Sequence, residues 1–305
     1  MKKMLLIVFL LPFSPFTGNN VSAGENSPVI FSYDWPASAE NERDYYSIDL
    51  DTATIIEIDP KKSSYPLTTM DTFDPEIIDY WHARGKRLVR RCYSVRYNKN
   101  GKKTGFATAE ELIKIWSDAL NEPNTDGIAI DEFYSHDPFV KTWMSSFNEA
   151  LFETWDEALR TVRKRYPDKL IMVWMWGWGE HSQPILESIN AYADYFIPEV
   201  YYPENTAGGY PDFDFPRFRE AIDLFEGHVP GISKKILLGI GCHERFYDND
   251  PDIDYGGFIE AQIETIAGDP ILSGLSGIGI YKPAALSPSN IKRLNNSIKA
   301  HILKK

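Results

Sequence analysis

Short apolar runs alternate with longer amphipathic stretches along the chain, and this alternation restricts the fold more than any other feature of the sequence. Eight runs have the length and the β-branched or aromatic content of strands: 29–33, 55–58, 88–93, 126–132, 171–176, 195–201, 236–240 and 277–281. Helical segments separate most of them at the spacing of β-strand–α-helix units. We therefore predict an α/β fold, a single-domain (β/α)8 TIM barrel.

An open doubly wound sheet is the alternative fold, but no glycine-rich phosphate-binding fingerprint follows any strand. The second strand is the weakest of the eight, because residues 68–73 compete with it. Helices are predicted at 75–83, 109–120 with Thr108 as N-cap, 139–165, 184–191, 216–225, 257–266 and 289–302.

The first 23 residues have the pattern of a bacterial-type signal peptide. Lys2 and Lys3 precede an apolar core, and Val21-Ser22-Ala23 is a small-residue cleavage signal. The apolar run is short for a membrane span and contains two prolines. We expect a secreted or periplasmic protein, with the barrel domain formed by residues 24–305.

Charge and cysteine content limit the possible partners. The net charge is -12, and it becomes -14 without Lys2 and Lys3. Such an acidic chain disfavours nucleic acid and, after signal cleavage, anionic membrane as partners. Cys92 and Cys242 lie in or next to predicted strands and are expected to be buried free thiols. The sequence does not indicate an oligomeric state.

The segment 125–134 contains the strongest functional signal. An apolar strand ends in the adjacent carboxylates Asp131 and Glu132, followed by two aromatic residues. A buried strand has no packing reason to end in two like charges, because their desolvation is costly. In barrel enzymes the carboxyl ends of the strands form the active site. Carboxylates beside aromatic side chains at this place indicate sugar hydrolysis.

Polar and aromatic residues also collect at the ends of the other predicted strands. Because all these ends belong to one rim of a barrel, we expect them to line one cleft. The candidate residues are Tyr33, Asp34, Trp35, Arg91, Tyr93, Asp131, Glu132, Tyr134, Trp174, Trp176, Trp178, Glu199, Tyr201, Tyr202, His243, Glu244 and Tyr281.

The segment around Asp131 resembles the fourth-strand motifs of TIM-barrel glycoside hydrolases. It is similar to the chitinase-type motif at Asp126, Gly127 and Asp131, whereas Ala129 replaces an Asp and Phe133 replaces the catalytic Glu. It also resembles the retaining barrels whose fourth strand ends in Asn-Glu. There Glu132 matches the acid/base residue, and the resemblance implies a nucleophile after the seventh strand, at Glu244.

Glycoside hydrolysis requires two carboxyl groups from different strands. We predict Glu132 as proton donor and Glu199 as nucleophile or general base, with Glu244 as substitute nucleophile. Asp131 would tune Glu132 or hold a sugar hydroxyl. Two-residue periodicity places Ala129 and Asp131 on the interior face, which aims Glu132 outward under strict alternation, so the choice between the two acids stays open.

Other interpretations of the same residues remain open. Asp131 and Glu132 could begin a helix, and Glu199 could pair with Arg91 inside the barrel. Trp174 and Trp176 could fill the barrel core instead of stacking on sugar. No metal-binding pattern or cofactor motif is evident, and neither metal nor cofactor is predicted. A carbohydrate-binding protein on a degenerate barrel and a polysaccharide lyase are the alternative functions.

Overall fold

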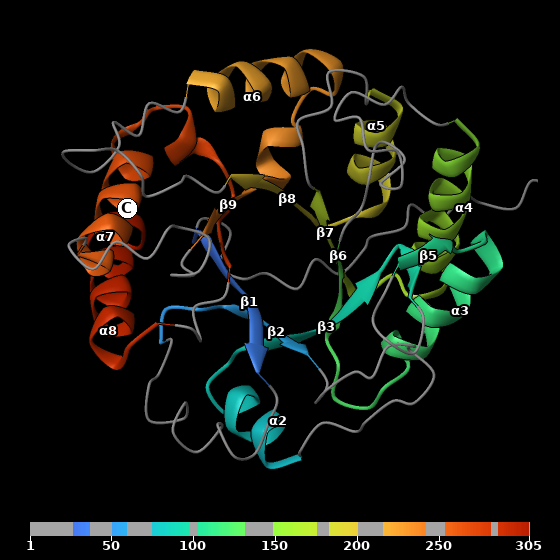
Figure 1. Cartoon of the computed structure of the whole chain (residues 1–305), viewed down its shortest axis with the longest axis horizontal. Coiled ribbons are helices and arrows are strands. Elements are labelled where there is room, and N and C mark those ends of the chain that lie inside the picture. The colour runs from blue at the N-terminus through green and yellow to red at the C-terminus, as the bar shows by residue number, and fades with distance from the viewer. Residues whose placement is uncertain are drawn as a thin grey trace, which may run out of the picture.

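A computed structural model describes residues 27–36, 51–59, 75–97, 103–131, 149–175, 183–200, 216–241, 254–281 and 286–304. Eight parallel strands form a closed barrel, in which the first strand pairs with both the second and the last (Figure 1). In order around the barrel they are β1 (Val29–Pro36), β2 (Ile55–Asp59), β3 (Arg87–Tyr93), β6 (Gly127–Asp131), β7 (Leu170–Met175), β8 (Tyr195–Val200), β9 (Leu237–Gly241) and β10 (Gly277–Tyr281). The predicted (β/α)8 barrel and its eight strands are confirmed.

Helices surround the barrel and cover its strands (Figure 1). They are α2 (Pro75–His82), α3 (Ala109–Leu120), α4 (Glu149–Arg165), α5 (Gln183–Tyr192), α6 (Pro216–His228), α7 (Tyr255–Gly268) and α8 (Pro288–Ser297), with a π-helical turn at Ile298–Ile302 and 3-10 turns at Ile232–Lys235 and Leu272–Gly274. Thr108 caps α3 as predicted. Its side chain accepts a hydrogen bond from the Glu111 amide, and the Glu111 carboxylate accepts one from the Thr108 amide. The predicted helical stretch at 139–148 and the competing strand at 68–73 lie outside the described residues.

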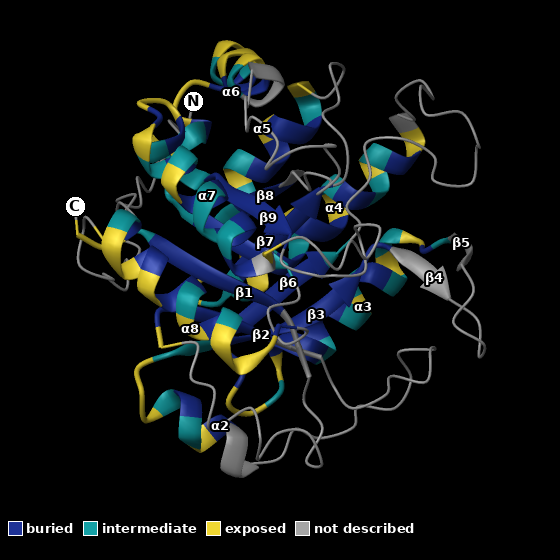
Figure 2. Cartoon of the chain, turned by 60° about the vertical axis from the view of Figure 1, so that its left-hand side comes forward, coloured by how far each residue is buried: buried dark blue, intermediate teal, exposed yellow. Residues whose placement is uncertain are grey.

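The strands have an outer and an inner face, and each face belongs to a separate hydrophobic cluster. On β6, Ile128 and Ile130 pack outward against the helices, whereas Ala129 belongs to the cluster inside the barrel. The predicted interior position of Ala129 is therefore confirmed. Figure 2 shows the strands mostly buried and the outer sides of the helices exposed. Two-residue alternation between two buried faces explains why the strands are apolar nearly throughout.

Trp174 fills the centre of the barrel. Its side chain is completely buried, and its six-membered ring lies next to Gly239 of β9 and Gly279 of β10. A Cβ atom on Gly239 would come within 2.7 Å of the Pro198 carbonyl oxygen and 3.1 Å of Trp174 Cζ3. Glycine at this point of β9 therefore makes room for the indole. Of the two roles considered for Trp174, the structure places it in the barrel core.

A small antiparallel hairpin, β4 (Val95–Tyr97) and β5 (Lys103–Phe106), follows β3 and was not predicted. Its strands have three and four residues, which is too short for a period-two pattern to be recognised. The dipeptide Asn100-Gly101 between the strands is typical of tight hairpin turns and was the available signal. The hairpin directly follows the carboxyl end of β3 in the chain.

Candidate functional site at the carboxyl end of the barrel

The structure describes only part of the predicted site. Side chains are described for Tyr33, Arg91, Tyr93, Asp131, Trp174 and Tyr281. Only the backbone is described for Asp34, Trp35 and Glu199, and the other candidates lie outside the described residues: Glu132, Tyr134, Trp176, Trp178, Tyr201, Tyr202, His243 and Glu244. Their positions and roles therefore stay predictions.

Asp131 is the last residue of β6, and its side chain is partly exposed. It occupies the interior position that follows Ala129 by one strand period, and Tyr33 from β1 donates a hydrogen bond to its Oδ2. Because β2 and β3 lie between β1 and β6 in the sheet, this contact crosses the barrel interior. The chain thus brings a carboxylate and a phenol hydroxyl together from positions 98 residues apart.

A buried ion pair lies inside the barrel on two neighbouring strands. Glu57 on β2 is completely buried, and its Oε1 accepts from both Nε and Nη2 of Arg91 on β3, each at 2.6 Å. Arg91, one of the predicted substrate-binding residues, is buried, and its guanidinium pairs with this carboxylate. Glu57 was missed by the sequence analysis. The signal was a Glu in the middle of the apolar run Ile55–Ile58, where only a partnered charge is tolerated.

Aromatic rings surround Tyr33 at the top of the barrel core. Tyr281 stacks on it with ring centroids 5.0 Å apart and an interplanar angle of 28°. Trp174 meets it edge-on, with centroids 4.5 Å apart. Among the described aromatic candidates at this end, Tyr33, Tyr93 and Trp174 are buried, whereas Tyr281 is partly exposed. Within the described part of the site, Tyr281 is thus the aromatic side chain with a surface open to a ligand.

Burial controls the protonation of two groups near the site. Burial of Tyr33 raises its pKa well above the ordinary value, the nearby Asp131 charge raises it further, and the Arg91 charge opposes the shift. Tyr33 is therefore a protonated donor. Burial also raises the pKa of Cys92 to about 12, so this free cysteine is a packed thiol and not a nucleophile. The predicted buried free thiol is confirmed for Cys92, and Cys242 lies outside the described residues.

Neither a cluster of metal ligands nor a membrane-spanning helix occurs in the described segments. No group of three or more His, Cys, Asp or Glu side chains is arranged to hold a metal ion in these segments. In the same part of the chain, no helix has the length and apolar content that crossing a bilayer requires.

Comparison with known proteins identifies the fold. No protein-family model matches the chain, and no curated protein sequence matches it. Among solved structures, it is similar to a chitinase from Bacteroides thetaiotaomicron, with a TM-score of 0.58, 12% identity, and 92% and 98% of the two chains covered. It is also similar to a family 18 chitinase from Pseudoalteromonas aurantia, with a TM-score of 0.56, 14% identity, and 89% and 100% covered.

A family 10 endoxylanase from a sugarcane soil metagenome has a TM-score of 0.53 at 7% identity, with 89% and 97% of the two chains covered. At these identities the likeness concerns the fold. The resemblance to TIM-barrel glycoside hydrolases that the segment around Asp131 indicated is therefore confirmed for the architecture of the chain. Fold alone does not define a reaction, because function depends on the site.

Proposed function

We propose that this protein is an exported glycoside hydrolase that cleaves glycosidic bonds of a poly- or oligosaccharide. One observation carries the proposal: Asp131 ends β6 on the barrel interior, where it accepts a hydrogen bond from the buried Tyr33. A carboxylate at the carboxyl end of a barrel strand has the position of a catalytic group. The fold shared with chitinases and an endoxylanase supports the same reaction class.

The reaction needs a proton donor at the leaving oxygen and a second carboxylate at the sugar carbon. We assign the donor to Glu132, which follows Asp131 in the chain, and the nucleophile or base to Glu199 on β8. Backbone position 199 follows Ile197, a residue of the interior cluster, by one strand period, which supports a place at the mouth of the barrel. Glu244 remains the substitute nucleophile.

Asp131 has a supporting role in this proposal. It would either tune the protonation of Glu132 or hold a sugar hydroxyl. The distance between the two catalytic carboxyl groups then sets the stereochemistry: about 5 Å gives retention, and roughly 6.5–9.5 Å gives inversion. Partly exposed Tyr281 offers an apolar ring face to the C–H face of a sugar. The signal pattern of residues 1–23 supports the proposed export of the chain.

The test is release of new reducing ends from a panel of polysaccharides by the mature protein. We expect Glu132→Gln and Glu199→Gln each to lower turnover by at least about a hundredfold, since each removes a group that acts in the transition state. Glu220→Gln is the matched control, because Glu220 is an exposed residue of α6.

Near-normal rates in both site variants would contradict the assignment. Glycan binding without product release would favour a carbohydrate-binding protein. Unsaturated products that absorb in the ultraviolet would indicate a lyase instead.

A further inference from the structure

The hydroxyl of Tyr33 is directed at Asp131 from within the barrel core. Tyr33 is 3% exposed, whereas Asp131 is partly open to solvent at the end of β6. The hydrogen bond between them therefore connects a fixed interior group with a carboxylate at the mouth. A group in this arrangement determines how the carboxylate is held.

The ring of Tyr33 is confined on several sides. Tyr281 stacks on it, Trp174 meets it edge-on, and the guanidinium carbon of Arg91 lies 4.3 Å from the ring centroid. A ring packed in this way moves only if its neighbours move, because protein interiors are close-packed. Its hydroxyl is therefore held at one place relative to β6.

Arg91 is itself fixed by Glu57. The guanidinium donates twice to one carboxylate oxygen at 2.6 Å, and both side chains are buried. A desolvated cation over a phenol ring is attracted by the ring electrons more strongly than an exposed one. The ion pair thus places a positive charge against Tyr33, and Tyr33 connects this pair with Asp131.

Tyr33 remains a hydrogen-bond donor over the ordinary pH range. Its burial, and next to that the negative charge of Asp131, raises its pKa well above the usual value of about 10. An ionised phenol would lose the donor and face the carboxylate as a like charge. The protonated hydroxyl instead favours the charged form of the carboxylate.

We propose that Tyr33 is a positioning residue that orients the Asp131 carboxylate and favours its ionised form, and that the Glu57–Arg91 ion pair keeps the Tyr33 ring in place. The catalytic meaning of this arrangement rests on the proposed function. The arrangement itself is a property of the free protein, so it is tested without a substrate.

The experiment compares wild type with Tyr33→Phe, which removes the hydroxyl and keeps the ring. The aspartate carboxyl carbons of the mature protein are labelled with ¹³C and titrated by NMR, and Asp131→Asn identifies the Asp131 resonance by its loss. We expect the midpoint of that resonance to rise by about one pH unit in Tyr33→Phe, because the charged form loses a donor. Tyr166→Phe is the matched control: it removes a hydroxyl that donates to the Ser117 carbonyl at 3.4 Å, and it should leave the midpoint unchanged.

A second readout follows the rate of sugar release against pH. The acid limb should move to higher pH in Tyr33→Phe, with kcat lowered and KM little changed, because the removed hydroxyl acts through Asp131. A midpoint that Tyr33→Phe leaves in place overturns the inference, whatever the rate. If the midpoint rises and wild type releases no sugar from any polysaccharide, the positioning role is supported and the proposed function fails.

Discussion

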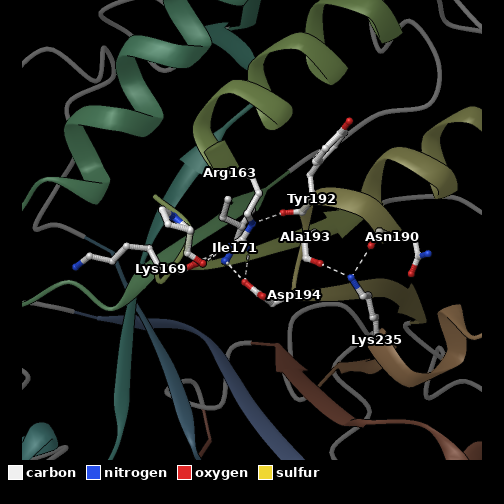
Figure 3. Close-up of polar contacts among 9 residues, drawn as sticks. Arg163, Lys169, Ile171, Asn190, Tyr192, Ala193, Asp194 and Lys235 are labelled. Atoms are coloured by element: carbon white, nitrogen blue, oxygen red, sulfur yellow. Dashed lines mark hydrogen bonds and ion pairs between the residues drawn. The ribbon is translucent and has the colours of Figure 1, made fainter. Parts of the chain in front are cut away.

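The two ends of the barrel use charged side chains in different ways. At the amino end of the strands, charged side chains bind backbone groups as well as one another: Arg163 donates to the carbonyl oxygens of Tyr192 and Lys169 and pairs with Asp194, and Lys235 donates to the carbonyl oxygens of Asn190 and Ala193 (Figure 3). Inside the barrel, toward its carboxyl end, side chains bind one another: Glu57 pairs with Arg91 on the neighbouring strand, and Tyr33 donates to Asp131 across the interior.

The backbone contacts at the amino end serve the stability of the fold, whereas the costly interior contacts have the character of a functional site. Side chains at the amino end satisfy the hydrogen bonds of backbone groups where helices end and strands begin. Asp194 accepts from the Ile171 amide at 2.8 Å, and Asp126 accepts from the Leu88 amide at 2.7 Å. Such contacts hold neighbouring segments together and need no particular chemistry. The contacts inside the barrel carry a desolvation cost, and they do not cap backbone groups of neighbouring segments. Such costly polar contacts are the expected property of a functional site.

The interior ion pair should give the largest effect. We expect Glu57→Gln to lower the free energy of unfolding by about 3–5 kcal/mol, because it leaves the Arg91 charge buried without its partner carboxylate. Urea denaturation measures the loss. The double variant with Met at both positions should recover much of it, since no buried charge remains. A loss under about 1 kcal/mol in the single variant would contradict the comparison.

A smaller effect is expected at the amino end. Asp194→Ala removes the acceptor of Arg163 and of the Ile171 amide, at a site that water reaches, and should cost about 1–2 kcal/mol in the same measurement. Asp194→Asn should cost less, because the amide oxygen still accepts. Sugar release should be unaffected in both variants. A fall in kcat would show that the two ends are not independent.

The smallest effect is a pH dependence at the amino end of β10. Burial would raise the pKa of Asp269, but hydrogen bonds from the Leu272 amide, from Arg219 and from the Ile271 amide outweigh it and lower the pKa. The stability contributed is present above the unfolded value near pH 4 and is lost as pH falls through the folded value. The gap in unfolding free energy between wild type and Asp269→Asn should therefore narrow from pH 6 to pH 3. A difference in unfolding free energy that stays constant with pH would show that the charge of Asp269 does not stabilise the fold.

The sequence predicted the fold well because the strands are short apolar runs with clear ends. Even Ile55–Asp59, the weakest candidate, is a barrel strand. The interior position of Ala129 also followed from its small side chain, and two-residue periodicity put Asp131 on the same face. The hairpin β4–β5 was missed because its strands are too short for any period, and Glu57 was missed because its strand was judged mainly on apolar content.

The site was predicted as a place but not as a set of contacts. Clustering at strand ends identified Asp131, Tyr33 and Arg91 correctly as residues of one end of the barrel. The assignment of Tyr33 and Arg91 to the substrate stays a prediction, and the partners that the structure describes for them are Asp131 and Glu57. Periodicity gives the face of a strand on which a side chain lies, but it does not give the partner on another strand.

The order of strands and helices, the inner and outer faces, and the place of Asp131 at the end of its strand were determined by the sequence, because each depends on local patterns of a few residues. Tertiary structure decided which charges meet. Tyr33 and Asp131 are 98 residues apart, and only closure of the barrel brings them together. Contacts of that kind depend on how eight strands wind around one axis, and no short segment of the chain contains that information.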